Sequence, residues 1–306
     1  MEQAEMKIKS IAPWFGGKRM LAGEIVRELG PHSMYVEPFC GSMAVLLMKP
    51  KSGSDIVNDL HGNIINLALV IASKRCYELY DRLYRTMDCE TIFDGAKEMV
   101  MAKGEFEPPA GPGAVTEEHV ERAYIYFVVS WMGRNGISGT KRCNYQKARR
   151  WTPGGGSGAV RFASAVDSMP AWHERLRRVN IYCMDGFELL EKIEDHRQTA
   201  IYLDPPYLRH TVDKSRSGNS VYQHEFEPGD HEKLAARLKR FERARVVVSY
   251  YDDPQLDELY PGWTKRKMEI QKTLHLQNKR NVKRVMAPEV LLLNGPSYAN
   301  EEKGLF

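Results

Sequence analysis

The segment Asp204-Pro205-Pro206-Tyr207 sets an acid, two prolines and an aromatic ring directly after the apolar run 200–203. Proline fixes the backbone φ angle and has no N–H group, so this segment presents carbonyl oxygens without amide donors. The Asp204 carboxylate completes a cluster of hydrogen-bond acceptors, for which a planar exocyclic amine is the complementary donor. Tyr207 adds a ring on which an unstacked base would lie, worth about 1–3 kcal/mol. The pattern predicts a site for an aminated heterocycle; a turn that merely ends a strand is the alternative.

The same acceptors suit one kind of chemistry. An amine on a purine ring is a poor nucleophile because its lone pair is delocalised into the ring. When Asp204 and the Pro205 carbonyl accept its hydrogens, they favour the more pyramidal, electron-rich nitrogen that attacks. The segment therefore predicts activation of an amino group for nucleophilic attack.

Three further acids follow apolar runs that are typical of strands. Glu37 ends the first, Asp59 follows the second and Asp185 follows the third. Ligands of open α/β sheets bind beyond the carboxyl ends of the strands, and an acid after the second strand accepts hydrogen bonds from ribose hydroxyls. The turn at Gly41 has neither a Walker pattern nor GxGxxG, so it is a binding loop or a simple turn. Asp185 has helix capping as its alternative.

Short β-rich runs alternate with helical patterns over much of the chain. Strands are expected at 34–37, 55–58, 180–184, 200–203, 245–250 and 289–293, and helices at 43–48, 62–71, 187–193 and 230–241. This alternation predicts an α/β fold with a mainly parallel sheet and helices on both faces. We expect strand 289–293 to close one edge of the sheet.

The middle of the chain breaks this rhythm. Helical patterns at Tyr77–Met87 and Glu117–Trp131 and two loop-rich pieces, 108–115 and 152–158, lie there without alternating strands. We therefore predict an inserted, mostly helical domain over 73–173, and a catalytic domain made of 1–72 and 174–306.

Composition narrows the class of protein. The chain has 306 residues, is 42% hydrophobic and 27% charged, and carries a net charge of +4. Its five scattered cysteines and nine histidines form no metal-ligand pattern, so no metal site is expected. No run approaches the roughly 20 apolar residues of a membrane helix, and no signal peptide is evident, which predicts a cytoplasmic protein.

Basic residues gather in two clusters. The first lies in a stretch without acids between Arg122 and Val166, and comprises Arg134, Lys141, Arg142, Lys147, Arg149, Arg150 and Arg161. The second runs from Lys265-Arg266-Lys267 to Lys283-Arg284. Such clusters suit DNA phosphates, and Arg134 or Asn135 is of a type that reads base edges. A solvated basic surface is the alternative for either cluster.

Taken together, the motifs resemble those of the Dam-type adenine-specific DNA methyltransferases. In order they are PWFGGK at 13–18, VEPFCGS at 36–42, VNDLHGN at 57–63 and LDPPY at 203–207, and weaker similarity covers nearly the whole chain. The resemblance implies a class I, Rossmann-like methyltransferase sheet with an inserted target-recognition domain. It also implies S-adenosylmethionine as methyl donor and double-stranded DNA as partner, with no metal.

Residue by residue, the resemblance places Trp14, Gly17 and Lys18 at the donor, Glu37, Phe39 and Gly41 at its amino-acid end, Asp59 at the ribose and Asp185 at its adenine. Asp204, Pro205, Pro206 and Tyr207 would carry the target base. A surface lysine after a Gly-Gly turn is the alternative for Lys18. Many relatives have a second small residue where this chain has Met43, which puts the backbone approach to the donor there in question.

The expected reaction is transfer of a methyl group to the 6-amino group of adenine in DNA after base flipping. Methylation of the 4-amino group of cytosine, an RNA substrate and a catalytically silent DNA-binding relative are the alternatives. A cognate restriction endonuclease, acting separately in a restriction-modification pair, is a candidate partner.

Overall fold

The computed structural model describes residues 6–14, 16–104, 106–134, 143–147, 157–208, 226–227, 229–271 and 286–299. The chain forms two compact units. The first consists of Met1–Arg19 and Cys40–Gly186, and the second of Met20–Phe39 and Phe187–Phe306. The helical segment 73–173 thus shares a unit with residues that flank it on both sides.

The strands are those of a mixed α/β protein. They are β1 (Met34–Glu37), β2 (Ser54–Asn58), β3 (Val179–Tyr182), β4 (Thr199–Leu203), β5 (Arg245–Tyr251), β6 (Thr264–Gln271) and β7 (Met286–Leu293). The sheet order is β3-β2-β1-β4-β5-β7-β6, with parallel pairs β2/β3, β1/β4 and β4/β5. β7 runs antiparallel to both of its neighbours. The expected mainly parallel sheet is confirmed.

One prediction about the sheet is wrong. β7 does not close an edge, because it lies between β5 and β6, and β6 ends the strand order. The segment Thr264–Gln271 forms a strand that was not predicted, because its sequence pattern indicates only a basic cluster. Lysine and arginine are common on edge strands, where they oppose pairing with another chain. The run of lysine and arginine in this segment is therefore also typical of an edge strand.

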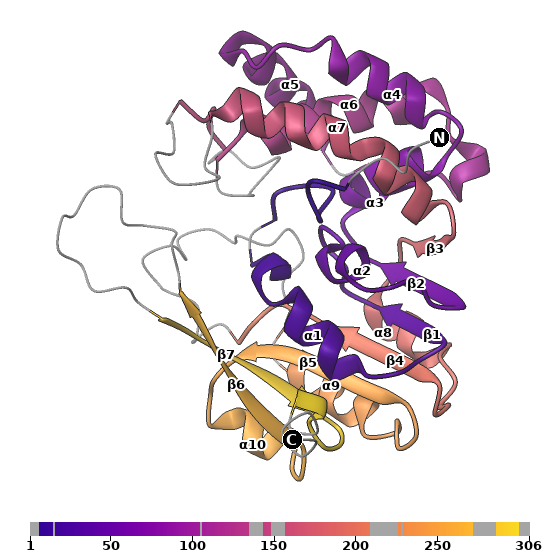
Figure 1. The fold of residues 1–306 in the computed structure, drawn as a ribbon, viewed down its shortest axis with the longest axis vertical. Coiled ribbons are helices and arrows are strands. Elements are labelled where there is room, and N and C mark those ends of the chain that lie inside the picture. The colour runs from indigo at the N-terminus through magenta and orange to yellow at the C-terminus, as the bar shows by residue number, and fades with distance from the viewer. Residues whose placement is uncertain are drawn as a thin grey trace, which may run out of the picture. The chain divides into compact units, whose positions relative to one another are not determined.

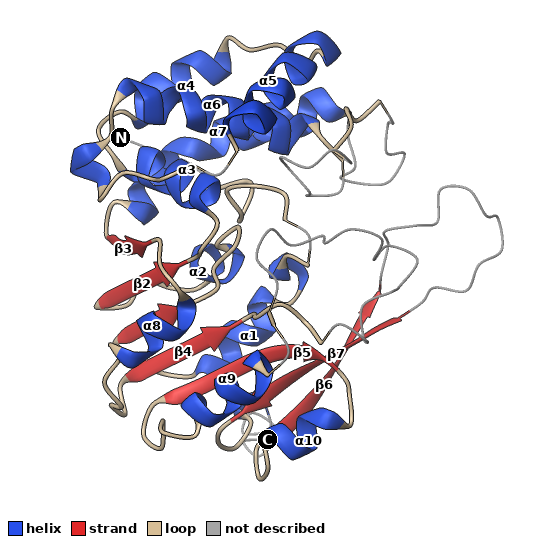
Figure 2. Cartoon of the chain, turned by 180° about the vertical axis from the view of Figure 1, so that it is seen from behind, coloured by secondary structure: helices blue, strands red, loops and turns tan. Residues whose placement is uncertain are grey.

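Helices cover both faces of the strands in the second unit. α1 (Ala22–Leu29) lies on one face, and α8 (Gly186–Glu191) and α9 (Asp230–Leu238) lie on the other (Figures 1 and 2). All five residues of β4 are buried, which explains their continuous apolar run. The short helix α10 (Gln255–Leu259) follows β5.

The first unit is mainly helical. Helices α3 to α7 pack against one another there (Figure 1). The helices are α2 (Ala44–Met48), which precedes β2, α3 (Gly62–Ala72), α4 (Cys76–Tyr84), α5 (Glu90–Lys103), α6 (Glu117–Met132) and α7 (Gly158–Leu176). The described part of the chain also has 3-10 turns at Lys18–Met20 and Pro112–Ala114. The expected helices near 77–87 and 117–131 are confirmed, whereas α5 and α7 were not predicted. Phe93, Ala96 and Val100 are apolar residues at helical spacing, and all three are buried in α5. This spacing could have predicted the helix from the sequence.

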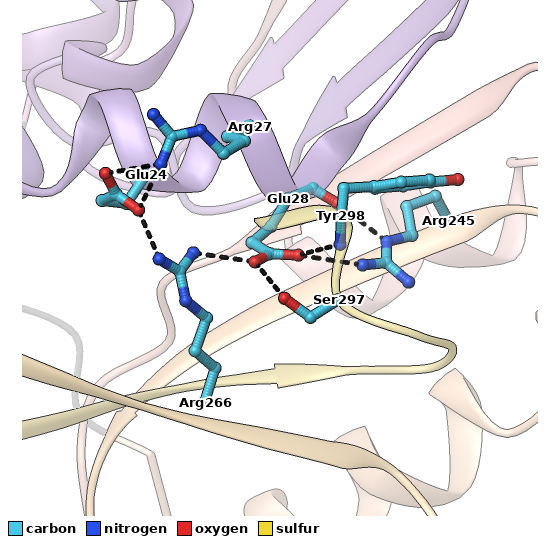
Figure 3. A network of polar contacts seen from close by, with 7 residues as sticks. All are labelled: Glu24, Arg27, Glu28, Arg245, Arg266, Ser297 and Tyr298. Atoms are coloured by element: carbon cyan, nitrogen blue, oxygen red, sulfur yellow. Dashed lines mark hydrogen bonds and ion pairs between the residues drawn. The ribbon is translucent and has the colours of Figure 1, made fainter. Parts of the chain in front are cut away.

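The second unit is tied together by a buried carboxylate, Glu28 at the end of α1. Its side chain is fully buried and forms ion pairs with Arg245 of β5 and Arg266 of β6. It also accepts hydrogen bonds from the Ser297 hydroxyl and the Tyr298 main-chain N–H (Figure 3). One side chain thereby joins α1, two strands and the segment after β7.

Candidate active site

The centre of the candidate site in the first unit is Asp59, directly after β2. Its Oδ2 accepts a hydrogen bond from the Gly41 main-chain N–H at 2.8 Å, and its Oδ1 accepts one from the His61 N–H at 2.9 Å. A main-chain bond from Cys40 N to Asn58 O, 2.9 Å long, holds the same two segments together. The two backbone donors fix the orientation of the carboxylate.

Trp14 packs against this centre. A Cβ atom on Gly41 would lie 2.7 Å from the Trp14 Nε1, and Gly41 has a φ of +44°, so both space and backbone require glycine there. The Trp14 ring also meets the His61 ring edge-on, with centroids 5.4 Å apart. The structure thus brings together Trp14, Gly41 and Asp59, which the family resemblance placed at one ligand.

Gly17 and Lys18 follow in a tight turn. The Gly17 N–H donates to the Trp14 carbonyl at 3.1 Å, and the Lys18 ammonium donates to the Gly16 carbonyl at 2.7 Å. Lys18 is only 6% exposed. The alternative reading of Lys18 as a surface lysine is therefore wrong.

Met43 is the one described non-glycine residue with a positive φ. It caps α2 in the left-handed conformation, with φ 60° and ψ 31°, and its side chain is fully buried. This conformation costs roughly 1–2 kcal/mol for a residue with a Cβ atom. The position therefore keeps a backbone typical of glycine, although the residue itself is large.

Asp185 is held near the end of β2 by Asn58, which was not among the predicted site residues. The Asn58 side chain donates to the Met184 carbonyl at 2.9 Å and accepts from the Met184 N–H at 3.0 Å. This bidentate contact mimics a strand pairing just before Asp185. Asn58 is fully buried at the end of a strand, a signal that could have identified it.

The second unit carries the remaining predicted residues. Glu37, at the end of β1, is buried and accepts a hydrogen bond from the Tyr35 hydroxyl at 2.9 Å. Phe39 meets Phe226 edge-on at 5.8 Å between centroids, and Phe226 stacks on Phe187 at 5.6 Å. Phe39 is thus part of an aromatic cluster.

The Asp204 segment follows β4 directly, as predicted. The Ser249 hydroxyl donates to Asp204 Oδ1 at 2.9 Å. The Tyr207 ring meets the Tyr251 ring at 4.5 Å in a T-shaped arrangement and lies 6.1 Å from the Tyr250 ring. Tyr207 is only 6% exposed, so its ring is fixed by β5 residues. Ser249 was not among the predicted site residues, although a serine inside the apolar run 246–250 indicates a buried polar group with a specific partner.

Comparison with known proteins identifies the family. The D12 class N6 adenine-specific DNA methyltransferase family matches residues 14–281 of the chain. The chain belongs to this family. It is accordingly an enzyme that methylates the 6-amino group of adenine in DNA. The retron Ec67 DNA adenine methylase of Escherichia coli is 26% identical to it over 270 residues, which make up 84% of this chain and 82% of that protein.

The matched region of the methyltransferase begins at Trp14 and contains every predicted site residue. Membership implies a methyl donor and a DNA substrate. Among the described residues there is no group of acids, histidines and cysteines that would hold a metal ion. None of the described helices has the length and apolarity that crossing a membrane requires.

The basic residues of the methyltransferase divide into two groups. Arg134 and Lys147 are exposed, and Lys147 forms an ion pair with Glu90 at 2.7 Å. Arg161 donates instead to the carbonyls of Trp131 and Gly133, at 2.7 and 3.2 Å. Asn135, Lys141, Arg142, Arg149 and Arg150 lie outside the described residues.

Residues 143–147, which lie within the first basic cluster in the sequence, are held in place by contacts of Tyr145 and Cys143. Tyr145 makes a β-bridge with Gly133, its hydroxyl donates to Asp88 at 3.0 Å, and its ring lies 5.8 Å from Phe93 of α5. Burial, followed by the hydrogen bond to Asp88, raises the pKa of Tyr145 to about 12, so the phenol keeps the proton that it donates. A Cβ on Gly133 would lie 2.6 Å from the Cys143 Sγ, so this junction is tightly packed.

The first residues of the second basic cluster are paired with acids. Lys265 contacts Asp257 at 2.6 Å, Lys267 contacts Asp252 at 2.8 Å, and Arg266 contacts Glu28. These ion pairs hold β6 in the second unit, at residues whose clustered charge predicts phosphate contacts. Residues 272–285 of this cluster lie outside the described part.

Proposed function

We propose that the enzyme uses S-adenosylmethionine as its methyl donor, bound by Trp14, Gly17, Lys18, Glu37, Phe39, Gly41, Asp59 and Asp185. The bound donor supplies a methyl group on a positively charged sulfur, whose transfer to N6 leaves a thioether and releases one amino proton. The residues fit a nucleoside donor, because two backbone N–H groups orient the Asp59 carboxylate after β2, and a carboxylate at this place accepts hydrogen bonds from ribose hydroxyls. Glu37 and Asp59 are both acids at strand ends.

We propose that Asp204, Pro205, Pro206 and Tyr207 receive the target adenine after it is flipped out of the duplex. The observation that carries this proposal is the position of Asp204, one residue beyond β4, with its Oδ1 held by Ser249. The carboxylate and the Pro205 carbonyl accept hydrogens of the 6-amino group, which concentrates electron density on nitrogen. Neither proline offers an N–H that would compete for these acceptors.

Tyr207 orients the base in this proposal. Tyr251 and Tyr250 hold its ring in one orientation, so the flipped adenine meets a ring that is already fixed. Stacking of this kind contributes about 1–3 kcal/mol and is independent of the sequence around the base. Sequence selection is assigned to the inserted domain 73–173, with Arg134, Asn135, Lys141, Arg142, Lys147, Arg149 and Arg150 as DNA contacts. A separate cognate restriction endonuclease stays a prediction from the resemblance.

Methyl transfer from labelled S-adenosylmethionine to unmethylated genomic DNA tests the assignment. We expect N6-methyladenine at a short recurrent sequence with the wild type, and loss of at least about 100-fold in rate with Asp204→Ala. Asp204→Ala should still bind the donor in a calorimetric titration, whereas Asp59→Ala should bind it more weakly. Asp81→Ala, at an exposed position of α4, is the matched control and should behave as wild type.

Two results would contradict the proposal. Full activity of Asp204→Ala would remove the target-base assignment. Unchanged donor affinity in Asp59→Ala, with a folded protein, would remove the ribose assignment.

A further inference from the structure

The register of the sheet places Ser249 beside the proposed base-binding acid. β4 and β5 are parallel, and Leu203 pairs with Val248, so the next residues along the two strands are Asp204 and Ser249. The Ser249 Oγ lies 2.9 Å from Asp204 Oδ1 and 3.5 Å from the Leu203 carbonyl. The shorter contact, to a charged acceptor, is the stronger one. Ser249 is fully buried, so water does not compete for its hydroxyl.

Tyr202 extends this contact by one residue. It lies two positions before Asp204, so strand geometry directs both side chains to the same face. Its hydroxyl is 3.0 Å from the Ser249 Oγ, and its side chain is buried. The three residues form a chain from Tyr202 through Ser249 to Asp204, built from two neighbouring strands.

The direction of the hydrogen bonds follows from the number of protons. An ionised carboxylate only accepts, so the single Ser249 proton is donated to Asp204. Ser249 then has only lone pairs for Tyr202, and Tyr202 must be the donor. Burial, followed by the negative charge of Asp204, raises the pKa of Tyr202 well above its usual value, so the phenol keeps the proton that this role requires.

We propose that Ser249 is a positioning residue that sets the rotation of the Asp204 carboxylate for the adenine amino group, and that Tyr202 orients Ser249. The inference rests on the proposed function of Asp204. A carboxylate turns easily about its last bond, and one fixed donor at Oδ1 limits that rotation. Acceptor direction matters at the transition state, where a small misplacement of a reacting group lowers rates by up to about 100-fold.

The test measures single-turnover methyl transfer with preformed enzyme–DNA complex and saturating S-adenosylmethionine. Ser249→Ala should lower the rate by about 10- to 100-fold, with the Kd for DNA and for the donor unchanged. Tyr202→Phe should lower it by about 2- to 10-fold. Because Tyr202 acts through Ser249, the double variant should be no slower than Ser249→Ala. Ser249→Thr, which keeps the hydroxyl, should recover most of the rate.

A matched control separates positioning from loss of stability. Ser168 of α7 is also fully buried, donates to the Ser164 carbonyl and accepts from the Ile8 N–H. Ser168→Ala should lower the melting temperature in the same way as Ser249→Ala but leave the single-turnover rate unchanged.

Each outcome decides the inference. A wild-type rate in folded Ser249→Ala, or a loss seen only in ligand Kd, would overturn it. If Ser249→Ala does not fold, Tyr202→Phe decides, and an unchanged rate would overturn the inference. If the wild type binds DNA and donor without producing N6-methyladenine, the proposed function fails instead.

Discussion

The main-chain N–H of Gly41 and the carboxylate of Asp59 lie 2.8 Å apart, although they are 18 residues apart in the sequence. This bond joins the turn before α2 to the end of β2. Trp14 packs against Gly41 and leaves no room for a Cβ atom there. Three motifs that are separate in the sequence therefore form one packed centre, and a change in any of them should be felt by the others.

Gly41→Ala should disturb this centre directly. Its Cβ would lie 2.7 Å from the Trp14 Nε1, and the φ of +44° is unfavourable for alanine. We expect a loss of about 1–3 kcal/mol in the free energy of unfolding and weaker donor binding. Urea unfolding and calorimetric titration with S-adenosylmethionine measure the two effects.

The control for this variant is Gly95→Ala in α5 of the same unit. A Cβ at Gly95 meets no atom within 4 Å, so alanine should be neutral or stabilise the helix by about 0.5–1 kcal/mol. Equal effects of the two substitutions would refute the steric argument.

The first unit also contains a buried ion triad. Asp55 contacts Lys49 and Arg175 at 2.8 Å each, and none of the three side chains is more than 6% exposed. Asp55→Asn would leave two buried cations without their counter-charge. We expect a loss of about 3–5 kcal/mol in the free energy of unfolding, measured in urea at pH 7. Asp81→Asn, which breaks an exposed pair with Arg85, should change it by less than about 0.5 kcal/mol.

The triad predicts a pH dependence. Burial alone would raise the pKa of Asp55, but the Lys49 hydrogen bond and the charges of Arg175 and Lys49 outweigh it and hold the pKa below its usual 3.8. The stabilisation is therefore complete above the unfolded-state pKa and is lost as pH falls through the lower folded-state pKa. The free energy of unfolding of the wild type, measured in urea at a series of pH values, should fall steeply below pH 4. That of Asp55→Asn should lack the part of this fall that comes from Asp55. Parallel curves for the two proteins would contradict the prediction.

The contacts of Tyr145 should matter for DNA and not for the methyl donor. Tyr145→Phe removes the hydrogen bond to Asp88 but keeps the ring against Phe93. We expect the Kd for duplex DNA to rise by about 3- to 10-fold, because the neighbouring basic residues lose a fixed support. Donor affinity should not change.

Fluorescence anisotropy with a DNA duplex and calorimetry with the donor separate these two effects. Tyr84→Phe, on the exposed surface of α4, serves as the control. A rise in donor Kd that matches the rise in DNA Kd would argue for a general loss of structure.

The Glu28 network should be important for the stability of the second unit. Glu28→Gln keeps the shape of the side chain but removes the charge shared by Arg245 and Arg266. We expect a loss of about 3 kcal/mol in the free energy of unfolding. Glu258→Gln, at an exposed position of α10, should have almost no effect in the same measurement. Similar losses in the two variants would show that the network contributes little.

Much of the candidate site could be predicted from local sequence patterns. The strands that carry Glu37, Asp59 and Asp204 are short apolar runs followed by turn residues, so their ends are visible without any partner. The third strand, expected at 180–184, spans Val179–Tyr182 and so ends two residues earlier than its pattern predicts. Helices with glycine or proline inside them, such as α7 with Pro170, were harder to recognise.

The sequence by itself determined which acids end strands and that an acceptor cluster follows β4, because burial periodicity and proline geometry act over a few residues. Only the tertiary structure decided that Ser249 lies beside Asp204 and that β7 lies inside the sheet. These facts depend on strand register and strand order. Both are set by packing between segments far apart in the chain, which no local pattern records.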